Sequence, residues 1–536
     1  MSSATYTSLP LSSSAGASTR TFSHGGSITL TSSEPLQYTY AFRRTRVVVV
    51  CALFAALGGL TFGYDQGVIA NVLVMPDFVR RFPVTPAQIG WMTAVLELGA
   101  MIGALSASFA ADTWSRRYAI CIASVIFCIG SAMQAGASSF GFLTAGRAIG
   151  GFGIGALSMC APLYISEISA PDVRGRLLAL EQLTICVGVV LGFWTGYFTH
   201  GLGGSFAWRL PLAIQILPGI VLGFGCLLLP PSPRFLILKG DTDGARRSLS
   251  RLRDVPEDDD LLHLELLEIR IDVQLSQDAS WSALWHTYRS RTLIGVGLGF
   301  FQQWTGINAL LYYGPTLMAK LGLNSPLLGA GGIGIVQALA AWPAIALIDT
   351  AGRRPLYIYG AGSLAILHLG VAGLTWRYDT VWDQYPAAGY TAVALLYIFT
   401  AVYGVSLGPI TWVLPAEIFP TSVRSRGVAL STASTWFNNF LVGLSTPVLV
   451  ERSAAATYAL FAVACVFATI WSVRTLPETR GLALEEIDKA LGVADASTMA
   501  GESEADYRRK VEEQHGLPQL VRELLEPDAE EDGQLQ

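Results

Sequence analysis

Long runs of hydrophobic residues, separated by short polar breaks, make up most of this chain. About twelve of them approach or exceed the roughly 20 residues that a helix needs to cross the hydrocarbon core of a bilayer. They lie near residues 46–73, 88–111, 117–138, 141–165, 176–199, 208–230, 292–319, 326–349, 355–376, 388–414, 423–450 and 456–476. The strands of a membrane β-barrel would instead alternate apolar and polar positions over about ten residues. The pattern therefore predicts an all-α membrane protein.

The composition agrees with this class. Of the 536 residues, 52% are hydrophobic and only 14% are charged, whereas charged residues make up about 25% of ordinary soluble domains. The formal net charge of −5 says little about partners, because the excess of acidic over basic residues is concentrated in the tails. We expect a lipid bilayer around the protein and no nucleic-acid partner.

Arginine and lysine residues concentrate in alternate polar breaks. One side of the predicted bundle carries Arg43, Arg44, Arg46, Arg116, Arg117, Arg174, Arg176, the segment from Arg234 to Arg253, Arg289, Arg291, Arg353, Arg354, Arg424, Arg426 and Arg480. The other side carries only Arg80, Arg81, Arg209, Lys320, Arg377 and Arg452. Because positively charged loops remain in the cytoplasm, both termini are predicted to be cytoplasmic. That placement requires an even number of spans.

A short polar motif occurs twice, half a protein apart. It reads Asp-Thr-Trp-Ser-Arg-Arg from Asp112 and Asp-Thr-Ala-Gly-Arg-Arg from Asp349. A second pair, from Glu167 to Arg174 and from Glu417 to Arg424, follows in the same order. Internal repeats of this kind are typical of secondary transporters. The repeat predicts two pseudo-symmetric six-helix domains.

Hydrophilic segments flank and divide these domains, which we place at residues 46–230 and 291–476. Residues 1–45 are rich in Ser and Thr, which predicts a disordered cytoplasmic tail. Residues 231–290 carry leucines among charged residues, which predicts cytoplasmic amphipathic helices between the domains. Residues 477–536 form an acidic C-terminal tail, which we also expect to be cytoplasmic and disordered.

Several motifs are shared with one known family. They are Gly63–Gly67 (Gly-Tyr-Asp-Gln-Gly), Gly146-Arg147, Pro162–Glu167 followed by Arg174-Gly175-Arg176, Pro230–Arg234, Gln302–Asn308 (Gln-Gln-Trp-Thr-Gly-Ile-Asn), Gly408–Trp412 (Gly-Pro-Ile-Thr-Trp) and Pro477–Gly481. With these motifs in order, the chain resembles the sugar porters of the major facilitator superfamily, in particular fungal sugar transporters, from about residue 47 to residue 488. The resemblance implies twelve transmembrane helices in the major facilitator fold, with two domains that rock about a central site.

The resemblance also implies where a sugar would bind. A sugar presents hydroxyl groups and an apolar ring face, so its site needs aromatic walls and amides, which both donate and accept hydrogen bonds. The matching positions are Gln182, Gln302, Gln303, Asn308, Gln337, Trp412, Trp436 and Asn439. The three amides of the seventh span can converge only if that span is partly non-helical or rotated.

Two positions in or beside the expected sugar site depart from the family pattern. Gln337 stands where Asn is usual, and Thr435 precedes Trp436 in place of Asn or Gln. These changes leave open a preferred sugar other than glucose. Intramembrane amides also join helices to one another, and this alternative stays open for each candidate.

Asp65 lies inside the first predicted span, where a carboxylate costs about 2.5–3.5 kcal/mol even on a lenient insertion scale. The resemblance pairs it with Arg147 of the fourth span. We expect protonation from outside to free Asp65 from Arg147, to help the sugar bind and to permit inward opening. Deprotonation inside would then restore the pair. In the alternative, the two residues form a structural salt bridge in a passive facilitator.

The repeated charged motifs are expected to form a cytoplasmic network that stabilises the outward-open state. Its members are Asp112, Arg116, Arg117, Glu167, Arg174, Asp349, Arg353, Arg354, Glu417, Arg424 and Glu478. An exposed ion pair contributes only about 0–1 kcal/mol, so such a network can bias a two-state equilibrium without locking it. Ser115 stands where the family usually has Gly, and Pro231 where it has Glu. We therefore expect the clusters of the two halves to differ in strength.

The function that these residues imply is proton-coupled uptake of a hexose or related monosaccharide. The alternatives are a passive facilitator, a symporter for a polyol or for a disaccharide such as sucrose, and a sugar sensor that barely transports. An enzyme is not predicted, because the six histidines are scattered and no phosphate-binding Gly-x-x-x-x-Gly-Lys-Ser/Thr loop occurs. We expect sugar and protons as small-molecule partners, the proton as coupling ion without a further cofactor, a functional monomer, and a place in the plasma membrane.

Overall fold

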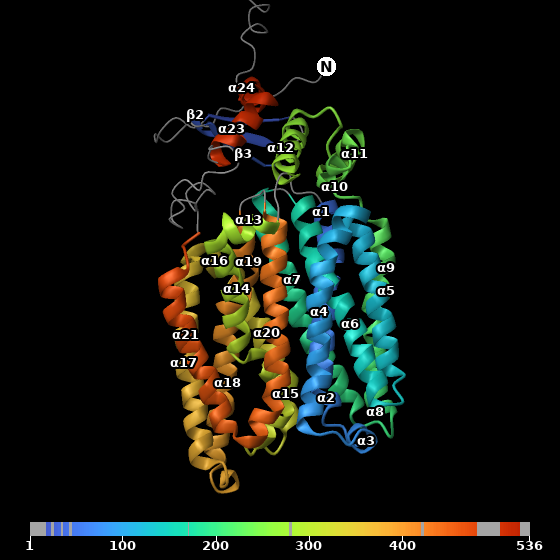
Figure 1. Cartoon of the computed structure of the whole chain (residues 1–536), viewed down its shortest axis with the longest axis vertical. Helices are drawn as coiled ribbons and strands as arrows, with labels where there is room; N and C mark the ends of the chain where they lie inside the picture. The colour runs from blue at the N-terminus through green and yellow to red at the C-terminus, as the bar shows by residue number, and fades with distance from the viewer. Residues whose placement is uncertain are drawn as a thin grey trace, which may run out of the picture.

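The computed structural model describes residues 18–22, 26–33, 36–41, 46–169, 171–277, 281–419, 423–479 and 504–525. Its main body is a bundle of long helices, and a smaller group of helices and strands covers one end (Figure 1). We call this covered end the linker face, because the helices α10 (Pro233–Leu238), α11 (Thr242–Arg253) and α12 (Asp260–Gln277) lie there. The opposite end is the far face.

Six rods form the first half of the bundle. They are α1 (Arg46–Ala55) with α2 (Leu57–Val72), α4 (Pro86–Trp114), α5 (Arg116–Ala135), α6 (Phe140–Ile168), α7 (Pro171–Thr199), and α8 (Phe206–Ile214) with α9 (Ile216–Leu228). The short α3 (Pro76–Arg81) joins the first two rods on the far face. Lipid offers the backbone no hydrogen bonds, so each apolar run folds as a helix, which pairs its backbone groups internally.

Six further rods form the second half. They are α14 (Arg289–Trp304) with α15 (Ile307–Lys320), α16 (Pro326–Ala351), α17 (Arg353–Tyr378), α18 (Pro386–Val405) with α19 (Leu407–Ile418), α20 (Arg424–Arg452) and α21 (Ala454–Thr475). A short 3-10 helix, η1 (Trp382–Gln384), precedes α18 on the far face.

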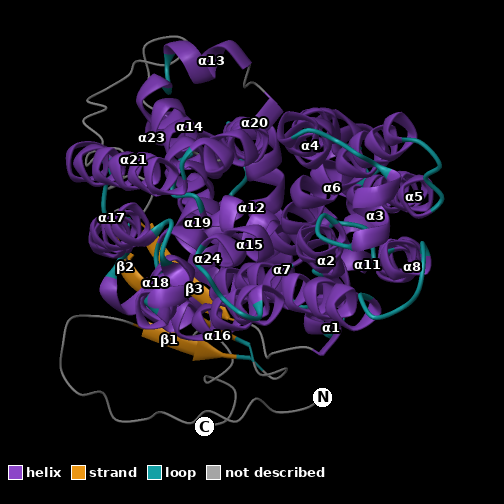
Figure 2. Cartoon of the chain, turned by 90° about the horizontal axis from the view of Figure 1, so that it is seen from below, coloured by secondary structure: helices purple, strands orange, loops and turns teal. Residues whose placement is uncertain are grey.

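The two halves pair their rods in the same way. In the first half α2 packs on α7, α4 on α6 and α5 on α9, and in the second half α14 packs on α20, α16 on α18 and α17 on α21. Figure 2 looks along the bundle and shows the two groups of helices side by side. The predicted twelve spans in two pseudo-symmetric six-helix domains are confirmed.

Ten of the described segments are long and apolar enough to cross a membrane by length and composition alone. Two rods differ from that simple pattern. The rod of α14 and α15 is interrupted at Thr305 and Gly306, so neither piece is long enough by itself. Helix α20 is long, but it buries polar residues such as Thr435, Asn438 and Asn439. Both rods lie at the contact between the halves, where α20 packs along α4 and α15 packs on α2.

Glycine permits the closest helix contacts of the first half. A β-carbon on Gly63 of α2 would collide with the carbonyl group of Ile185 on α7, and one on Gly155 of α6 would collide with that of Ala100 on α4. Small residues let helix backbones approach in this way. The first half is therefore a tightly packed block that holds α2 and α6 at fixed positions.

The segment between the halves forms α10, α11, α12 and the short α13 (Trp281–His286). A buried ion pair joins α11 to α12, with Nε of Arg253 2.9 Å from Oε2 of Glu265. The same arginine donates from Nη1 to the carbonyl oxygen of Ile168, at the end of α6, at 2.7 Å. These bonds attach the linker helices to the first half.

Parts of both tails are ordered on the linker face, where the sequence predicted disorder. An antiparallel sheet of β1 (Ser18–Thr21), β2 (Ser27–Ser33) and β3 (Leu36–Ala41) lies beside α23 (Glu504–Gln514) and α24 (Leu517–Leu525). Ile28 is buried in one apolar cluster with residues of α12 and α24, including Leu264 and Val521. Arg20 also donates from Nη1 to the carbonyl oxygen of Leu524 at 2.7 Å. Apolar contacts between segments far apart in the sequence thus order these parts.

Candidate functional site

The interruption between α14 and α15 positions three candidate amides. Gly306 has a φ of +83°, a conformation that glycine adopts without the steric cost of a β-carbon. The carbonyl oxygen of Thr305 lies 2.8 Å from Nε2 of His368, which holds the turn against α17. As expected from the sequence, this span is not a continuous helix, and Gln302 and Gln303 lie before the turn and Asn308 after it.

These amides form one hydrogen-bonded chain. Nδ2 of Asn308 donates to Oε1 of Gln303 at 2.6 Å, and Nε2 of Gln303 donates to Oε1 of Gln302 at 3.2 Å. Nε2 of Gln302 then donates to the hydroxyl of Tyr403 on α18 at 2.9 Å. At the other end, Nε2 of Gln66 on α2 donates to Oδ1 of Asn308 at 2.7 Å. We call these five residues the amide chain.

The amide chain crosses from one half of the bundle to the other. Its bond between Gln66 and Asn308 joins α2 of the first half to α15 of the second, and all five side chains are buried. Sequence reasoning did not assign Gln66 and Tyr403 to the site. Gln66 could have been found, because it follows Asp65 within the Gly63–Gly67 motif. Tyr403 carries no comparable signal, since a tyrosine in an apolar run is an ordinary packing residue.

The candidates on α20 contact the first half directly or through α15. Nδ2 of Asn439 donates to the hydroxyl of Tyr312 on α15 at 2.9 Å. The indole N–H of Trp436 donates to Oγ of Ser158 on α6 at 3.2 Å, and its ring meets Phe62 of α2 edge-on at 4.9 Å. Trp436 therefore lies in the contact between the halves.

The three remaining candidates lie outside the amide chain. Gln182 is half-buried on α7, where its Nε2 lies 3.7 Å from Sγ of Cys186 on the same helix. Gln337 of α16 is buried, and its Oε1 has no hydrogen-bond partner among the described residues. Trp412 is half-buried on α19.

Asp65 and Arg147 meet in the core of the first half. Nη2 of Arg147 lies 3.4 Å from Oδ2 of Asp65, and both side chains are at most 2% exposed. Arg147 also donates to the carbonyl oxygens of Met92 and Thr93 on α4, at 2.9 and 3.4 Å, and to Oε1 of Gln134 at 3.3 Å. Oδ1 of Asp65 has no hydrogen-bond partner in the described part of the chain. The arginine is thus held by several groups, whereas the carboxylate depends on one long contact.

The linker face carries two matching charge clusters, one in each half. In the first, Nε of Arg116 lies 2.9 Å from Oε2 of Glu167, and Oγ of Ser232 donates to the same carboxylate. In the second, Nη2 of Arg353 lies 2.9 Å from Oε1 of Glu417, and Oγ1 of Thr479 donates to Oε2 at 2.6 Å.

Other expected members of the network bind backbone groups. Arg117 donates to the carbonyl oxygen of Leu229 at 3.2 Å, and Arg424 donates to that of Phe419 at 3.1 Å. The carboxylate of Glu478 accepts the backbone N–H groups of Arg353 and Arg354 at 3.0 and 3.1 Å, and Arg354 also donates to a backbone carbonyl of α21. The side chains of Asp112, Arg174 and Asp349 lie outside the described parts.

The two halves also touch on the far face. A β-carbon on Gly90, near the start of α4, would collide with the carbonyl oxygen of Leu444 on α20. A β-carbon on Gly331 of α16 would lie 3.0 Å from the ring of Phe193 on α7. Together with the bonds from Gln66 and Trp436, these contacts join the halves on the far face and at the level of the amide chain.

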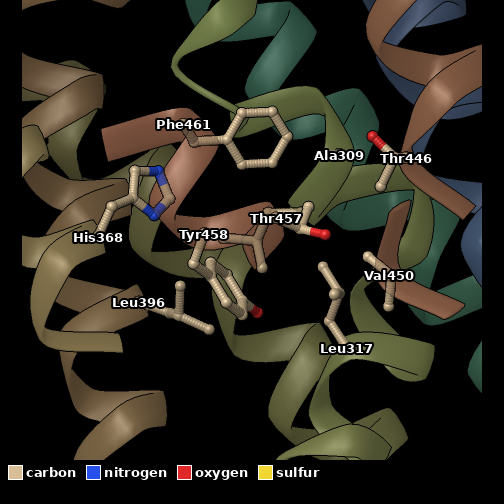
Figure 3. A pocket seen from close by; sticks show the side chains of 11 residues that line it. Ala309, Leu317, His368, Leu396, Thr446, Val450, Thr457, Tyr458 and Phe461 are labelled. Atoms are coloured by element: carbon tan, nitrogen blue, oxygen red, sulfur yellow. The ribbon is translucent and has the colours of Figure 1, made fainter. Parts of the chain in front are cut away.

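A small cavity lies behind the turn at Gly306, between α15, α17 and α21 (Figure 3). Its volume is about 10 Å³, whereas sites for small organic ligands occupy about 300–1,000 Å³. His368, Tyr458 and Phe461 face it in Figure 3. Nδ1 of His368 and the hydroxyl of Tyr458 have no partner among the described residues. This cavity has room for about one water molecule beside the turn, and it is too small for a sugar.

Comparison with known proteins identifies relatives over most of the chain. A family model described as "Sugar (and other) transporter" matches residues 51–491. The chain is 32% identical over 509 residues to the MFS glucose transporter mfs1 of Aspergillus flavus, a match that covers 88% of this chain and 93% of that protein. It is 30% identical over 504 residues to the high glucose sensor RGT2 of Saccharomyces cerevisiae. That match covers 90% of this chain and 65% of the sensor.

A solved structure shows a similar fold. The chain resembles the proton:xylose symporter XylE bound to 6-bromo-6-deoxy-D-glucose, with a TM-score of 0.70 and 27% sequence identity. The match covers 83% of this chain and 98% of that chain. These relatives are transport proteins and a sensor rather than enzymes, as the sequence predicted.

Proposed function

Because this chain belongs to the sugar transporter family of the major facilitator superfamily, we propose that it carries a monosaccharide, a hexose by preference, in symport with a proton. One observation supports the sugar in particular: a chain of buried amides closes across the two halves. A sugar is neutral and rich in hydroxyl groups, and amides offer it both donors and acceptors.

Sugar binding would exchange hydrogen bonds within the amide chain for bonds to hydroxyl groups. Each such bond is worth about 0.5–1.5 kcal/mol net. Several bonds would therefore give an affinity between about 1 mM and 1 μM, or roughly −4 to −8 kcal/mol. An affinity in this range suits a carrier, which must also release its substrate.

Proton coupling is the second part of the proposal, and Asp65 is its centre. Asp65 and Gln66 are consecutive residues of α2, so a shift of Asp65 relative to Arg147 also moves the bond from Gln66 to Asn308. Protonation of Asp65 would weaken its contact with Arg147 while the other bonds of the arginine persist. A membrane potential contributes about 2.3 kcal/mol per charge per 100 mV to such a step. The likeness to XylE, which is a proton:xylose symporter, favours the same coupling.

We propose that the linker face, with its arginine clusters, is cytoplasmic and that the protein acts as a monomer in the plasma membrane. The central rocking motion would part Gln66 from Asn308 each time the site opens.

The test is uptake of labelled hexose into liposomes that contain the purified protein, with and without an inward proton gradient. We expect accumulation that depends on the gradient and disappears with a protonophore. Gln303→Leu should abolish it, whereas the control Gln384→Leu, at an exposed residue of η1, should not. Equal uptake with and without the gradient would support the passive facilitator, in which Asp65 and Arg147 form a structural pair.

A competition panel settles the substrate class. Pentoses, disaccharides such as sucrose, and polyols would each be added to the labelled hexose. Stronger competition by a disaccharide or polyol than by hexoses would overturn the monosaccharide assignment. Specific binding without uptake by the reconstituted protein would instead favour a sensor, the class named for the relative from Saccharomyces cerevisiae.

A further inference from the structure

A second buried carboxyl group lies at the contact between the halves. Glu97 is in the middle of α4, and only 1% of its surface is exposed. Its Oε1 accepts a hydrogen bond from the hydroxyl of Tyr312 on α15, at 2.5 Å. Its Oε2 is buried and has no hydrogen-bond partner among the described residues. An ionised carboxylate whose hydrogen-bond donors are all neutral is costly to bury.

Tyr312 connects Glu97 to both groups of candidate sugar contacts. Its hydroxyl accepts from Nδ2 of Asn439 on α20 at 2.9 Å. It also lies four residues after Asn308 on α15, and residues so spaced are neighbours on one helix face. A change at Glu97 would therefore be transmitted through Tyr312 to Asn439 and to the face that carries the amide chain.

Few charged groups in the described part of the chain lie near Glu97. Among these residues, Arg147 and Asp65 are its charged neighbours, and Tyr312 and Tyr313 are its titratable neighbours from α15. Helix α20, which packs along α4, offers it the neutral amide of Asn439. Arg147 binds the carbonyl oxygen of Thr93, one helical turn before Glu97.

The buried region around Glu97 contains more acidic than basic side chains. One guanidinium, that of Arg147, lies among two carboxyl groups, those of Asp65 and Glu97. If both carboxyl groups were ionised, this buried region would carry a net charge of −1, whereas one bound proton makes it neutral. Like charges in a shared buried site favour retention of one proton.

We propose that Glu97 is a second proton-carrying carboxyl of this protein, protonated while the halves are closed and deprotonated when they part. As the halves separate, Tyr312 leaves Oε1, water reaches the carboxyl group, and the proton passes from Glu97 to that water. No covalent bond other than the O–H bond changes. This inference rests on the proposed function only for its role in coupling. The protonation of Glu97 itself can be measured without transport.

The first experiment is infrared spectroscopy of the purified protein in lipid. A protonated carboxyl group gives a C=O stretching band that an ionised carboxylate lacks. We expect Glu97→Gln to remove one component of this band and the control Glu451→Gln, at an exposed residue of α20, to leave it unchanged. Tyr312→Phe removes only the hydroxyl donor and should shift the same component, whereas Tyr390→Phe, at an exposed residue of α18, should not. An unchanged band in Glu97→Gln would overturn the proposal.

The second experiment separates coupling from sugar movement. A glutamine at position 97 is always neutral and can still accept from Tyr312, so equilibrium exchange of sugar across the liposome, which moves no net proton, should continue at a measurable rate. Accumulation against a gradient should fall at least tenfold, and its dependence on pH should flatten. If Glu97→Gln has lost the C=O band component but still accumulates sugar with the pH dependence of the parent protein, Glu97 has no part in coupling.

Failure of the proposed function would give a different result. If the parent protein shows no proton-dependent accumulation at all, symport fails while the band still reports the proton on Glu97. If Glu97→Gln does not fold, Tyr312→Phe supplies the same test, with the shift of the band and the altered pH profile as readouts.

Discussion

The two halves of the bundle share one arrangement of helices but bring different chemistry to their contact. The first half contributes one amide, Gln66, and the ionisable groups Asp65, Glu97 and Arg147. The second half contributes neutral amides and phenols, among them Asn308 and Tyr312. In the proposed mechanism a proton acts on the first half while a neutral sugar binds mainly to the second, and the bonds across the contact link the two events.

On the linker face the same halves remain alike. Arg116, Glu167 and Ser232 are arranged as Arg353, Glu417 and Thr479 are. The duplicated sequence is thus retained where both halves have the same task, which is to fix the helix ends. It has diverged at the contact between the halves, where we propose that one half binds the proton and the other binds the sugar.

Removing the cation from the first half should have the largest effect. Arg147→Met leaves Asp65 buried beside no compensating charge, and breaking a buried ion pair in this way costs about 3–5 kcal/mol. We expect the free energy of unfolding in detergent to fall by about that amount. The double variant Asp65→Asn/Arg147→Met should recover part of the loss, because both charges are gone. If Arg147→Met lowered the free energy of unfolding by the same amount whether position 65 is aspartate or asparagine, the pairing of Asp65 with Arg147 would be contradicted.

The functional residues of the first half could be predicted from the sequence more readily than those of the second half. Asp65 and Arg147 stand out because a charge within an apolar run is expensive, and the same reasoning could have identified Glu97 in the run 88–111. Tyr312 and Tyr403 could not be recognised, since their role depends on which helix faces them. The sheet beside α24 was also unpredictable, because it rests on contacts between residues about 500 positions apart, such as Arg20 and Leu524.

The bundle itself was predictable for a general reason. In lipid, each apolar run must pair its backbone groups internally and therefore forms a helix. The repeated polar motif indicates two related halves. The need to bring three amides together predicted a partly non-helical or rotated span, but neither the place of the interruption at Gly306 nor the contact of His368 with the turn was predicted. That contact comes from α17, which no local pattern connects to residue 306.

A smaller effect, on binding alone, is expected in the second half. Gln302→Ala removes a link of the amide chain and leaves the hydroxyl of Tyr403 without its donor. We expect the Kd for sugar to rise about tenfold, equivalent to about 1.4 kcal/mol. The pH dependence of binding should be unchanged, because no ionisable group is altered. Equilibrium binding at several pH values measures both quantities, and a shifted pH profile would mean that the two halves are not chemically separate.

The smallest effect concerns the matching clusters. Ser115 has a φ of +98° where the second half has Gly352 at +92°, and such a backbone costs a residue with a side chain about 1–3 kcal/mol. We expect Ser115→Gly to raise the free energy of unfolding by about 1 kcal/mol. Gly352→Ser should lower it by at least as much, because its β-carbon would also lie 2.6 Å from the carboxylate of Glu478. Thermal unfolding of both variants provides the measurement, and a neutral result in both would show that the two turns carry no such strain.

The most direct measurement of the division between the halves is sugar binding and sugar accumulation in Asp65→Asn. We expect the variant to bind and exchange sugar within a few-fold of the parent protein, because the amide chain is intact, while gradient-driven accumulation is lost. Asp379→Asn, at an exposed residue on the far face, serves as the control and should accumulate normally. Accumulation by Asp65→Asn equal to that of the control would contradict the central claim that the ionisable groups of the first half couple the proton to transport.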